Sequence, residues 1–101
     1  MVAVSPRIAS LLNKITATPD PETALWKVLS EYLDLKLDKA KRQSAAFEAK
    51  WEMSFEEFCA RSEDGRLGKD IYSYEVESDF WEWEKAETLR KHYAALKAEW
   101  T

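Results

Sequence analysis

Residues 33–51 read LDLKLDKAKRQSAAFEAKW, and this stretch decides the fold. Its apolar and small side chains recur at alternating steps of four and three residues, the heptad period of a helix that packs against another helix. The positions are Leu33, Leu37, Ala40, Ser44, Phe47 and Trp51, and Trp26 lies one heptad before them. Neither glycine nor proline occurs from Glu22 to Asp64. The pattern predicts one long helix over residues 21–51.

The start of this helix is marked by the tetrapeptide Thr18-Pro19-Asp20-Pro21. Its prolines stop an upstream helix, Asp20 can cap the new helix, and Pro21 suits the first helical position. Ser5-Pro6 has the same form and opens a short helix, whose apolar positions are Ile8, Leu11, Leu12 and Ile15. We therefore expect one helical domain over residues 1–101, with a short helix and linker over residues 1–19 and a hairpin core over residues 20–101.

The chain after Trp51 starts another helix near Ser54. Ser54 and Glu57 have the spacing of a capping box, and Met53 can pack on Phe58 as a hydrophobic staple. This helix should run for about ten residues and end at Gly65, because glycine adopts the left-handed conformation that closes helices. Residues 65–70 are then expected to form a loop.

A last helix is predicted from Ser73 to Trp100. Its apolar stripe is Val76, Phe80, Trp83, Ala86, Leu89, Tyr93, Leu96 and Trp100. At 1.5 Å per residue, the helices over residues 21–51 and 73–100 would be roughly 46 and 42 Å long. Two such helices can form an antiparallel hairpin, but each carries more apolar residues than one facing stripe needs.

These elements predict an all-α fold: a helical hairpin or bundle with two long helices, a short connecting helix and an N-terminal helix. The surplus of apolar positions predicts that the chain self-associates as a homodimer or binds a partner protein. The alternative is a break near Leu35–Asp38, which would fold the long helix in two and give a monomeric bundle.

Composition agrees with helices and narrows the classes of function. The chain has 101 residues with two glycines and three prolines, too few for the frequent turns of a sandwich or barrel. The net charge is −4, and residues 52–87 hold 12 acidic and 4 basic side chains. Such a protein has no electrostatic reason to bind bare nucleic acid, so a basic protein partner suits it better. One cysteine and no apolar run of about 20 residues favour a cytoplasmic protein without a membrane span.

The segment Asp79-Phe80-Trp81-Glu82-Trp83-Glu84 is the most unusual in the chain. Aromatic side chains surround the helix there, and tryptophan within an acidic rim is typical of a binding hot spot for a basic partner. The predicted contact residues are Glu75, Asp79, Phe80, Trp81, Glu82 and Trp83. The alternatives are that Trp83 belongs to the core, that Trp81 covers Tyr72, and that the carboxylates form a solvated helix face.

The sequence offers no catalytic or metal-binding constellation. His92 has no carboxylate or histidine at metal-ligand spacing, and Cys59 looks like a small buried residue without a base beside it. We therefore predict no enzyme activity, no cofactor and no metal. The basic residues between Lys36 and Lys50 are not accompanied by a helix-turn-helix motif for DNA binding. We expect them to form a solvent-exposed face of the helix or to contact the acidic residues 52–87 of a second subunit.

A pattern of helix starts, one loop and aromatics spans residues 36–100. It consists of Met53-Ser54-Phe55-Glu56-Glu57-Phe58, Gly65, Leu67-Gly68, Asp70, Ser73-Tyr74-Glu75 and Trp81 to Trp83. With it the chain resembles a group of short prokaryotic helical proteins that are treated as type II antitoxins.

The resemblance implies a small protein that wraps and neutralises a toxin, often a basic RNase, with carboxylates in the place of RNA phosphates. Many antitoxins also carry a DNA-binding half, and none is recognisable in this sequence. We expect a non-catalytic, antitoxin-like module that binds a basic partner by helical docking. The alternative is a homodimeric structural or adaptor protein with no toxin partner.

Overall fold

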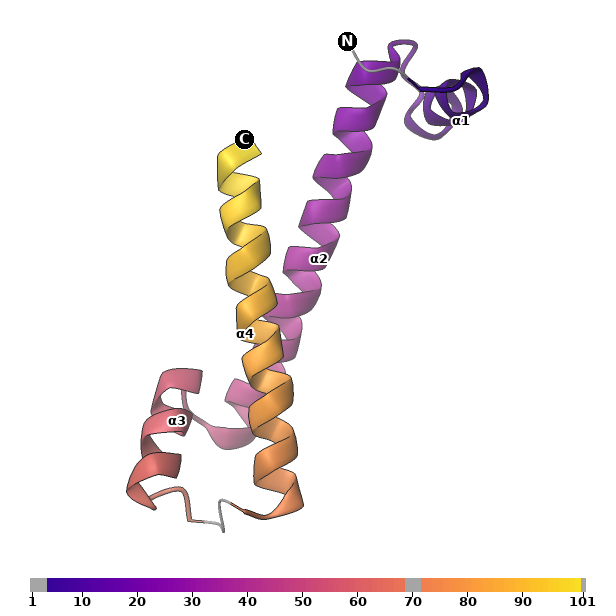
Figure 1. The fold of residues 1–101 in the computed structure, drawn as a ribbon. Coiled ribbons are helices and arrows are strands. Elements are labelled where there is room, and N and C mark those ends of the chain that lie inside the picture. The colour runs from indigo at the N-terminus through magenta and orange to yellow at the C-terminus, as the bar shows by residue number, and fades with distance from the viewer. Residues whose placement is uncertain (1–3, 69–71, 101) are drawn as a thin grey trace. The chain divides into compact units, whose positions relative to one another are not determined.

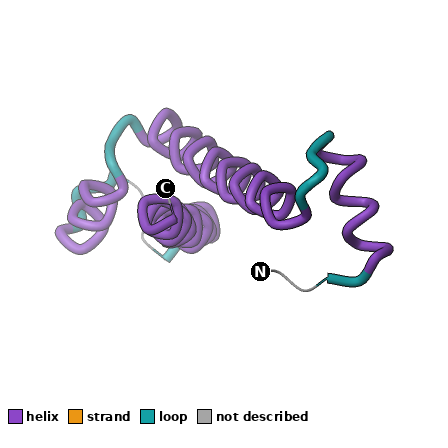
Figure 2. The backbone as a smooth tube through the Cα atoms, turned by 90° about the horizontal axis from the view of Figure 1, so that it is seen from above, coloured by secondary structure: helices purple, strands orange, loops and turns teal. Residues whose placement is uncertain are grey.

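The computed structural model describes residues 4–68 and 72–100. Within these ranges the chain forms four helices and no strand (Figures 1 and 2). They are α1 (Pro6–Thr16), α2 (Pro21–Trp51), α3 (Phe55–Asp64) and α4 (Tyr74–Trp100). The all-α fold predicted from the sequence is confirmed. None of the helices in the described ranges is long and apolar enough to cross a membrane.

Each helix begins where a short polar side chain caps it. Ser5 Oγ accepts a hydrogen bond from the Ile8 N–H at 3.2 Å, and Asp20 Oδ2 accepts one from the Thr23 N–H at 3.2 Å. The other two caps follow the same rule: Ser54 Oγ accepts from the Glu57 N–H at 3.1 Å, and Ser73 Oγ accepts from the Val76 N–H at 3.3 Å. The predicted caps at Ser5, Asp20 and Ser54 are confirmed, and α4 begins one residue later than predicted.

The helix ends also follow the sequence signals. α3 has ten residues and ends at Gly65, whose φ of +70° lies in the left-handed region that glycine adopts without strain. α2 runs unbroken through Leu35 and Asp38. The alternative of a break at that point is therefore wrong. The last residues of the predicted loop, Lys69 and Asp70, lie outside the described ranges.

The chain divides after Leu35 into two compact units, residues 1–35 (unit 1) and residues 36–101 (unit 2). Unit 1 contains α1 and the first half of α2, and unit 2 contains the second half of α2 with α3 and α4. The division lies inside a continuous helix and not at the linker before Asp20. The single domain over residues 1–101 stays a prediction.

Unit 2 is an antiparallel helical hairpin with an aromatic core. The core cluster consists of buried Phe58, Val76 and Trp83, with half-buried Phe47, Trp51, Met53, Phe55, Leu67 and Phe80 packed around it. α3 supplies Phe55 and Phe58, and it lies beside the end of the hairpin where α2 finishes and α4 begins (Figure 1). Further along the hairpin, small residues keep α2 and α4 tightly packed, since Ala40 and Ala86 are also buried.

Candidate protein-binding surface

Trp83 lies in the core of unit 2. Its side chain is 0% exposed, and its ring lies 5.7 Å from Phe47, 5.4 Å from Phe55 and 5.2 Å from Phe58, measured between ring centroids. Its indole N–H donates to Ser44 Oγ at 3.0 Å. This burial favours the alternative that Trp83 belongs to the core, since α2, α3 and α4 enclose its side chain, and its contact with a partner stays a prediction.

Asp79 joins α4 to α2 inside the same chain. Its Oδ2 accepts from Lys50 Nζ at 2.5 Å and from the Trp51 indole N–H at 3.0 Å, and its side chain is only 14% exposed. Glu75 extends the contact, since its Oε1 lies 3.4 Å from Lys50 Nζ. The hydrogen bond that Lys50 donates to Asp79 raises the pKa of Lys50 above its ordinary value. Asp79 and Glu75 thus pair with a basic residue on α2 of the same chain, and their contact with a partner protein stays a prediction.

Glu87 is the buried charged residue that the sequence analysis missed as a functional position. Its side chain accepts from Arg90 Nε at 2.8 Å, from an Arg90 terminal nitrogen at 3.1 Å and from Ser44 Oγ at 2.9 Å. The hydrogen bond from Arg90, with that from Ser44, lowers the pKa of Glu87 below its ordinary value, although burial opposes the shift. Because Ser44 Oγ also accepts a hydrogen bond from the Trp83 indole N–H, one hydrogen-bond network joins α2 to α4 across the hairpin. Its signal in the sequence was the i, i+3 spacing of Glu87 and Arg90, close to the apolar stripe.

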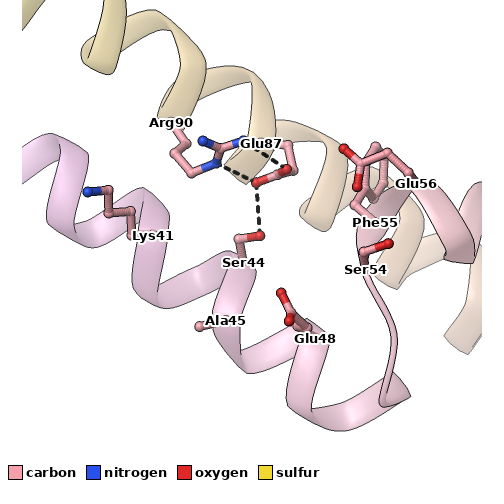
Figure 3. Close-up of a pocket in the computed structure, with 9 residues that line it drawn as sticks. All are labelled: Lys41, Ser44, Ala45, Glu48, Ser54, Phe55, Glu56, Glu87 and Arg90. Atoms are coloured by element: carbon pink, nitrogen blue, oxygen red, sulfur yellow. Dashed lines mark hydrogen bonds and ion pairs between the residues drawn. The ribbon is translucent and has the colours of Figure 1, made fainter.

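A groove of about 240 Å³ lies over this network, between α2, the start of α3 and α4. Figure 3 shows Glu87 bonded to Arg90 and to Ser44 within it. The lining residues are Lys41, Ser44, Ala45, Glu48, Ser54, Phe55, Glu56, Glu87 and Arg90. The groove mixes both signs of charge, and its most buried carboxylate is already neutralised by a guanidinium. Its geometry therefore supports packing of the hairpin more directly than ligand binding.

The large exposed side chains of unit 2 gather at the beginning of α4. Tyr74 is 86% exposed and Trp81 is 59% exposed, and Glu77 between them is also exposed. Their spacing of i, i+3 and i+7 places all three on one side of the helix. At 3.6 residues per turn, Trp83 lies about 180° around the helix from Tyr74, so this side faces away from the core. We call Tyr74, Glu77 and Trp81 the α4 outer face.

Neighbouring aromatic rings support the indole of Trp81. Phe80 contacts Trp81 edge to face, with 5.3 Å between ring centroids, and it stacks on Phe55 of α3 at 6.0 Å. Phe80 itself is half-buried, so it holds Trp81 more than it faces solvent. Tyr72, just before α4, is 83% exposed. Of the six predicted contact residues, Trp81 and Glu82 remain fully available at the surface, and Glu75 is partly available.

Cys59 and His92 are two further side chains with reactive groups. Cys59 is half-buried, and burial together with the charges of Glu63, Glu84 and Glu56 raises the pKa of its thiol, which favours the unreactive form. His92 is exposed and lies against Tyr93, with 5.1 Å between ring centroids. Among the residues that the structure describes, no group of three His, Cys, Asp or Glu side chains could hold a metal ion.

No protein family, curated protein or solved structure matches this chain. The antitoxin role and the adaptor role therefore stay predictions, and the geometry of the surface is the basis for choosing between them.

Proposed function

We propose that this protein is a non-catalytic, cytoplasmic, antitoxin-like binding protein, which neutralises a basic partner protein by docking it onto the α4 outer face. The observation that supports this most is the exposure of Tyr74 and Trp81 on the side of α4 opposite the core. Tyrosine and tryptophan dominate binding hot spots, because they offer a large apolar area together with a polar group. Nucleic acid enters this proposal only as part of the partner's complex.

The support of Trp81 by Phe80 favours binding further. A side chain that is already held against its neighbours loses little conformational freedom when a partner covers it. The contacts of Phe80 with Trp81 and with Phe55 connect the exposed indole to the packed core of unit 2. The surface is thus presented by a rigid helix and needs little reorganisation.

The charge around the outer face specifies the chemistry of the partner. Glu77 lies between the two aromatic residues, Glu82 follows Trp81, and residues 52–87 carry a net charge of −8 from 12 acidic and 4 basic side chains. A guanidinium group can stack on the face of an indole and pair with a carboxylate at the same time. An arginine-bearing surface therefore fits the α4 outer face better than a lysine-bearing one.

The test is to search the reading frames beside its own gene for a small basic protein and to co-express the chain with that protein. The wild-type chain is expected to co-purify with that protein and to relieve any growth defect that it causes. Trp81→Ala should weaken binding about thirtyfold, the effect of a hot-spot residue worth about 2 kcal/mol. Glu77→Lys should weaken binding more at low salt than at high salt, because salt screens the repulsion between the new lysine and the basic partner.

The matched control is Tyr32→Ala, which removes an aromatic side chain of similar exposure from unit 1. This variant should bind the basic protein as the wild type does. Unchanged binding by the double variant Tyr74→Ala with Trp81→Ala would show that the outer face is not the contact surface. If the wild-type chain does not bind the basic protein encoded beside its gene, the antitoxin role is wrong.

The alternative role of a homodimeric structural or adaptor protein is supported by a different observation, the exposed apolar side chains of unit 1. An adaptor of this kind would keep its activity when Tyr74 and Trp81 are both replaced by alanine. An antitoxin would lose its activity with the same double variant while remaining folded, so one variant separates the two roles.

A further inference from the structure

Unit 1 exposes most of its large apolar side chains. Leu12 and Ala24 are the only buried residues among its described positions, residues 4–35. Seven large side chains are between 44% and 70% exposed: Ile8, Leu11, Ile15, Trp26, Leu29, Tyr32 and Leu35. We call these seven residues the unit 1 apolar surface. Unit 2 is nearly twice as long, and the corresponding set among its described residues is Tyr72, Tyr74 and Trp81.

Two helices with so small a core do not make a stable unit by themselves. Segments below about 40 residues usually need a disulfide, a metal or oligomerisation to stay folded, and unit 1 has 35 residues. α1 has 11 residues, fewer than the roughly 12–15 that an isolated helix needs in water. Residues 1–35 contain no cysteine for a disulfide, and no group of three His, Cys, Asp or Glu side chains among the described residues could hold a metal ion, so association is the available route.

The area of the surface is large enough for a dimer interface. On α2, Trp26 and Leu35 are nine residues apart and lie about 180° around the helix from each other, so one contact covers only one of these two. The six large side chains that remain, at about half exposure, present on the order of 500 Å² of apolar area. A standard interface buries about 800 Å² on each partner, including its polar rim. The α1 residues Ile8, Leu11 and Ile15 are spaced i, i+3 and i+7, so they form one continuous stripe along the helix.

The charges of unit 1 indicate a second copy of the chain as the occupant. α1 carries Arg7 and Lys14 and no acidic residue, whereas residues 21–35 of α2 carry Glu22, Glu31 and Asp34 against Lys27. In a two-fold symmetric dimer, α1 of one copy can meet α2 of the other, and the reverse contact follows by symmetry. Each of these two contacts then joins a helix of charge +2 to a segment of charge −2.

We propose that two copies of this chain associate through the unit 1 apolar surface, with α1 of each copy packed on the first half of α2 of its partner. The α4 outer face takes no part in this contact. The dimer and the binding of a basic protein are therefore separable properties of the same chain.

The first experiment measures the mass of the full chain by sedimentation over a wide range of concentration. The wild type is expected to change from 11.8 kDa to twice that mass as concentration rises. Leu11→Glu and Leu29→Glu should each weaken the dimer about tenfold or more, because each places a charge in the apolar contact. Tyr74→Glu is the matched control, a similar change at an exposed position of unit 2, and should leave the dimer unchanged.

The second experiment tests the pairing of α1 with α2 by charge reversal. One variant combines Arg7→Glu with Lys14→Glu, and the other combines Glu22→Lys with Glu31→Lys. Each variant alone should dimerise more weakly than the wild type, since its α1 and α2 now carry the same sign of charge. An equimolar mixture should recover a dimer of wild-type strength, because both contacts of the mixed dimer are again between opposite charges.

Recovery in the mixture requires two molecules, so a variant that simply unfolds cannot imitate it. Helix content from circular dichroism confirms that each variant is folded. A wild type that stays monomeric at all concentrations would overturn the proposal, as would a Tyr74→Glu variant that dissociates as readily as Leu11→Glu. Failure of the mixture to recover would overturn the pairing of α1 with α2. Capture of the basic partner by Leu11→Glu tests the proposed function independently.

Discussion

Unit 1 and unit 2 are built from the same kind of amphipathic helix, but they place their aromatic side chains differently. In unit 2, α3 lies beside the hairpin and contributes Phe55 and Phe58, and the ring of Trp83 becomes fully buried. Residues 4–35, the described part of unit 1, form only α1 and the first half of α2, and Trp26 and Tyr32 stay 44% and 51% exposed. The comparison teaches that two helices bury one stripe each, and that a third element is needed to enclose a large aromatic side chain.

The largest expected effect that tests this comparison is the loss of Trp83. Trp83→Ala should lower the free energy of unfolding by about 3–5 kcal/mol, since it removes a fully buried aromatic side chain and leaves a cavity. Trp26→Ala in unit 1 should cost far less, because its side chain is 44% exposed. Urea unfolding followed by circular dichroism measures both. Equal losses for the two variants would contradict the difference between the units.

The polar network of unit 2 gives the second prediction. Glu87→Gln should cost about 1–3 kcal/mol at neutral pH, because it weakens the bonds that Arg90 and Ser44 make with a buried carboxylate. The exposed Glu77→Gln is the control and should have little effect. Both variants are compared with the wild type by urea unfolding across a range of pH.

The pH dependence of that loss follows from the sign of the pKa shift. The pKa of Glu87 is lowered on folding from its ordinary value of 4.5, chiefly by the hydrogen bond from Arg90. Its contribution to stability is therefore complete above pH 4.5 and is lost as the pH falls through the lower pKa of the folded state. The difference between wild type and Glu87→Gln should shrink over that range, and a difference that is constant with pH would contradict the assignment.

The helix boundaries could be predicted because their signals are local. Ser5, Asp20, Ser54 and Gly65 each act within one turn of helix, so a few residues of sequence contain the whole signal. Trp83 could likewise be assigned to the core from the period of its stripe. The assignment required only that the neighbouring residues be placed on a helix.

The partners of the charged residues could not be predicted in the same way. Asp79 meets Lys50, and Glu87 meets Ser44, because of the register between α2 and α4. That register comes from the packing of two helices whose contacting residues lie about 30 to 40 positions apart in the sequence, and no spacing within one helix encodes it. The α4 outer face could be predicted in part, since Tyr74, Glu77 and Trp81 have helical spacing, but their exposure depends on which side of α4 the other helices cover.

The third prediction compares the caps of the two units. Ser54→Ala should lower the free energy of unfolding by about 1 kcal/mol, because α3 must form for Phe55 and Phe58 to reach the core. Asp20→Ala should act locally instead, by speeding hydrogen exchange at Thr23 and Ala24 without moving the unfolding midpoint of unit 2. The lowered pKa of Asp20, caused by the hydrogen bonds from Thr23, predicts the same local opening in the wild type at acid pH. A shared midpoint shift for both variants would show that the two units unfold together.

The smallest effect is expected at the ion pair between Lys50 and Asp79. Lys50→Met removes the cation but keeps the indole N–H of Trp51 as a donor to Asp79, so unit 2 should lose little stability. The difference in stability between Lys50→Met and the wild type should disappear in high salt, because Lys50 is 44% exposed and salt screens its charge. The same change removes the ammonium group that lies between Glu75 and Asp79 and makes this part of α4 more negative. If the basic partner responds to the charge of α4, its binding should tighten at low salt in Lys50→Met, whereas Lys14→Met in unit 1, also the loss of one lysine, should leave it unchanged.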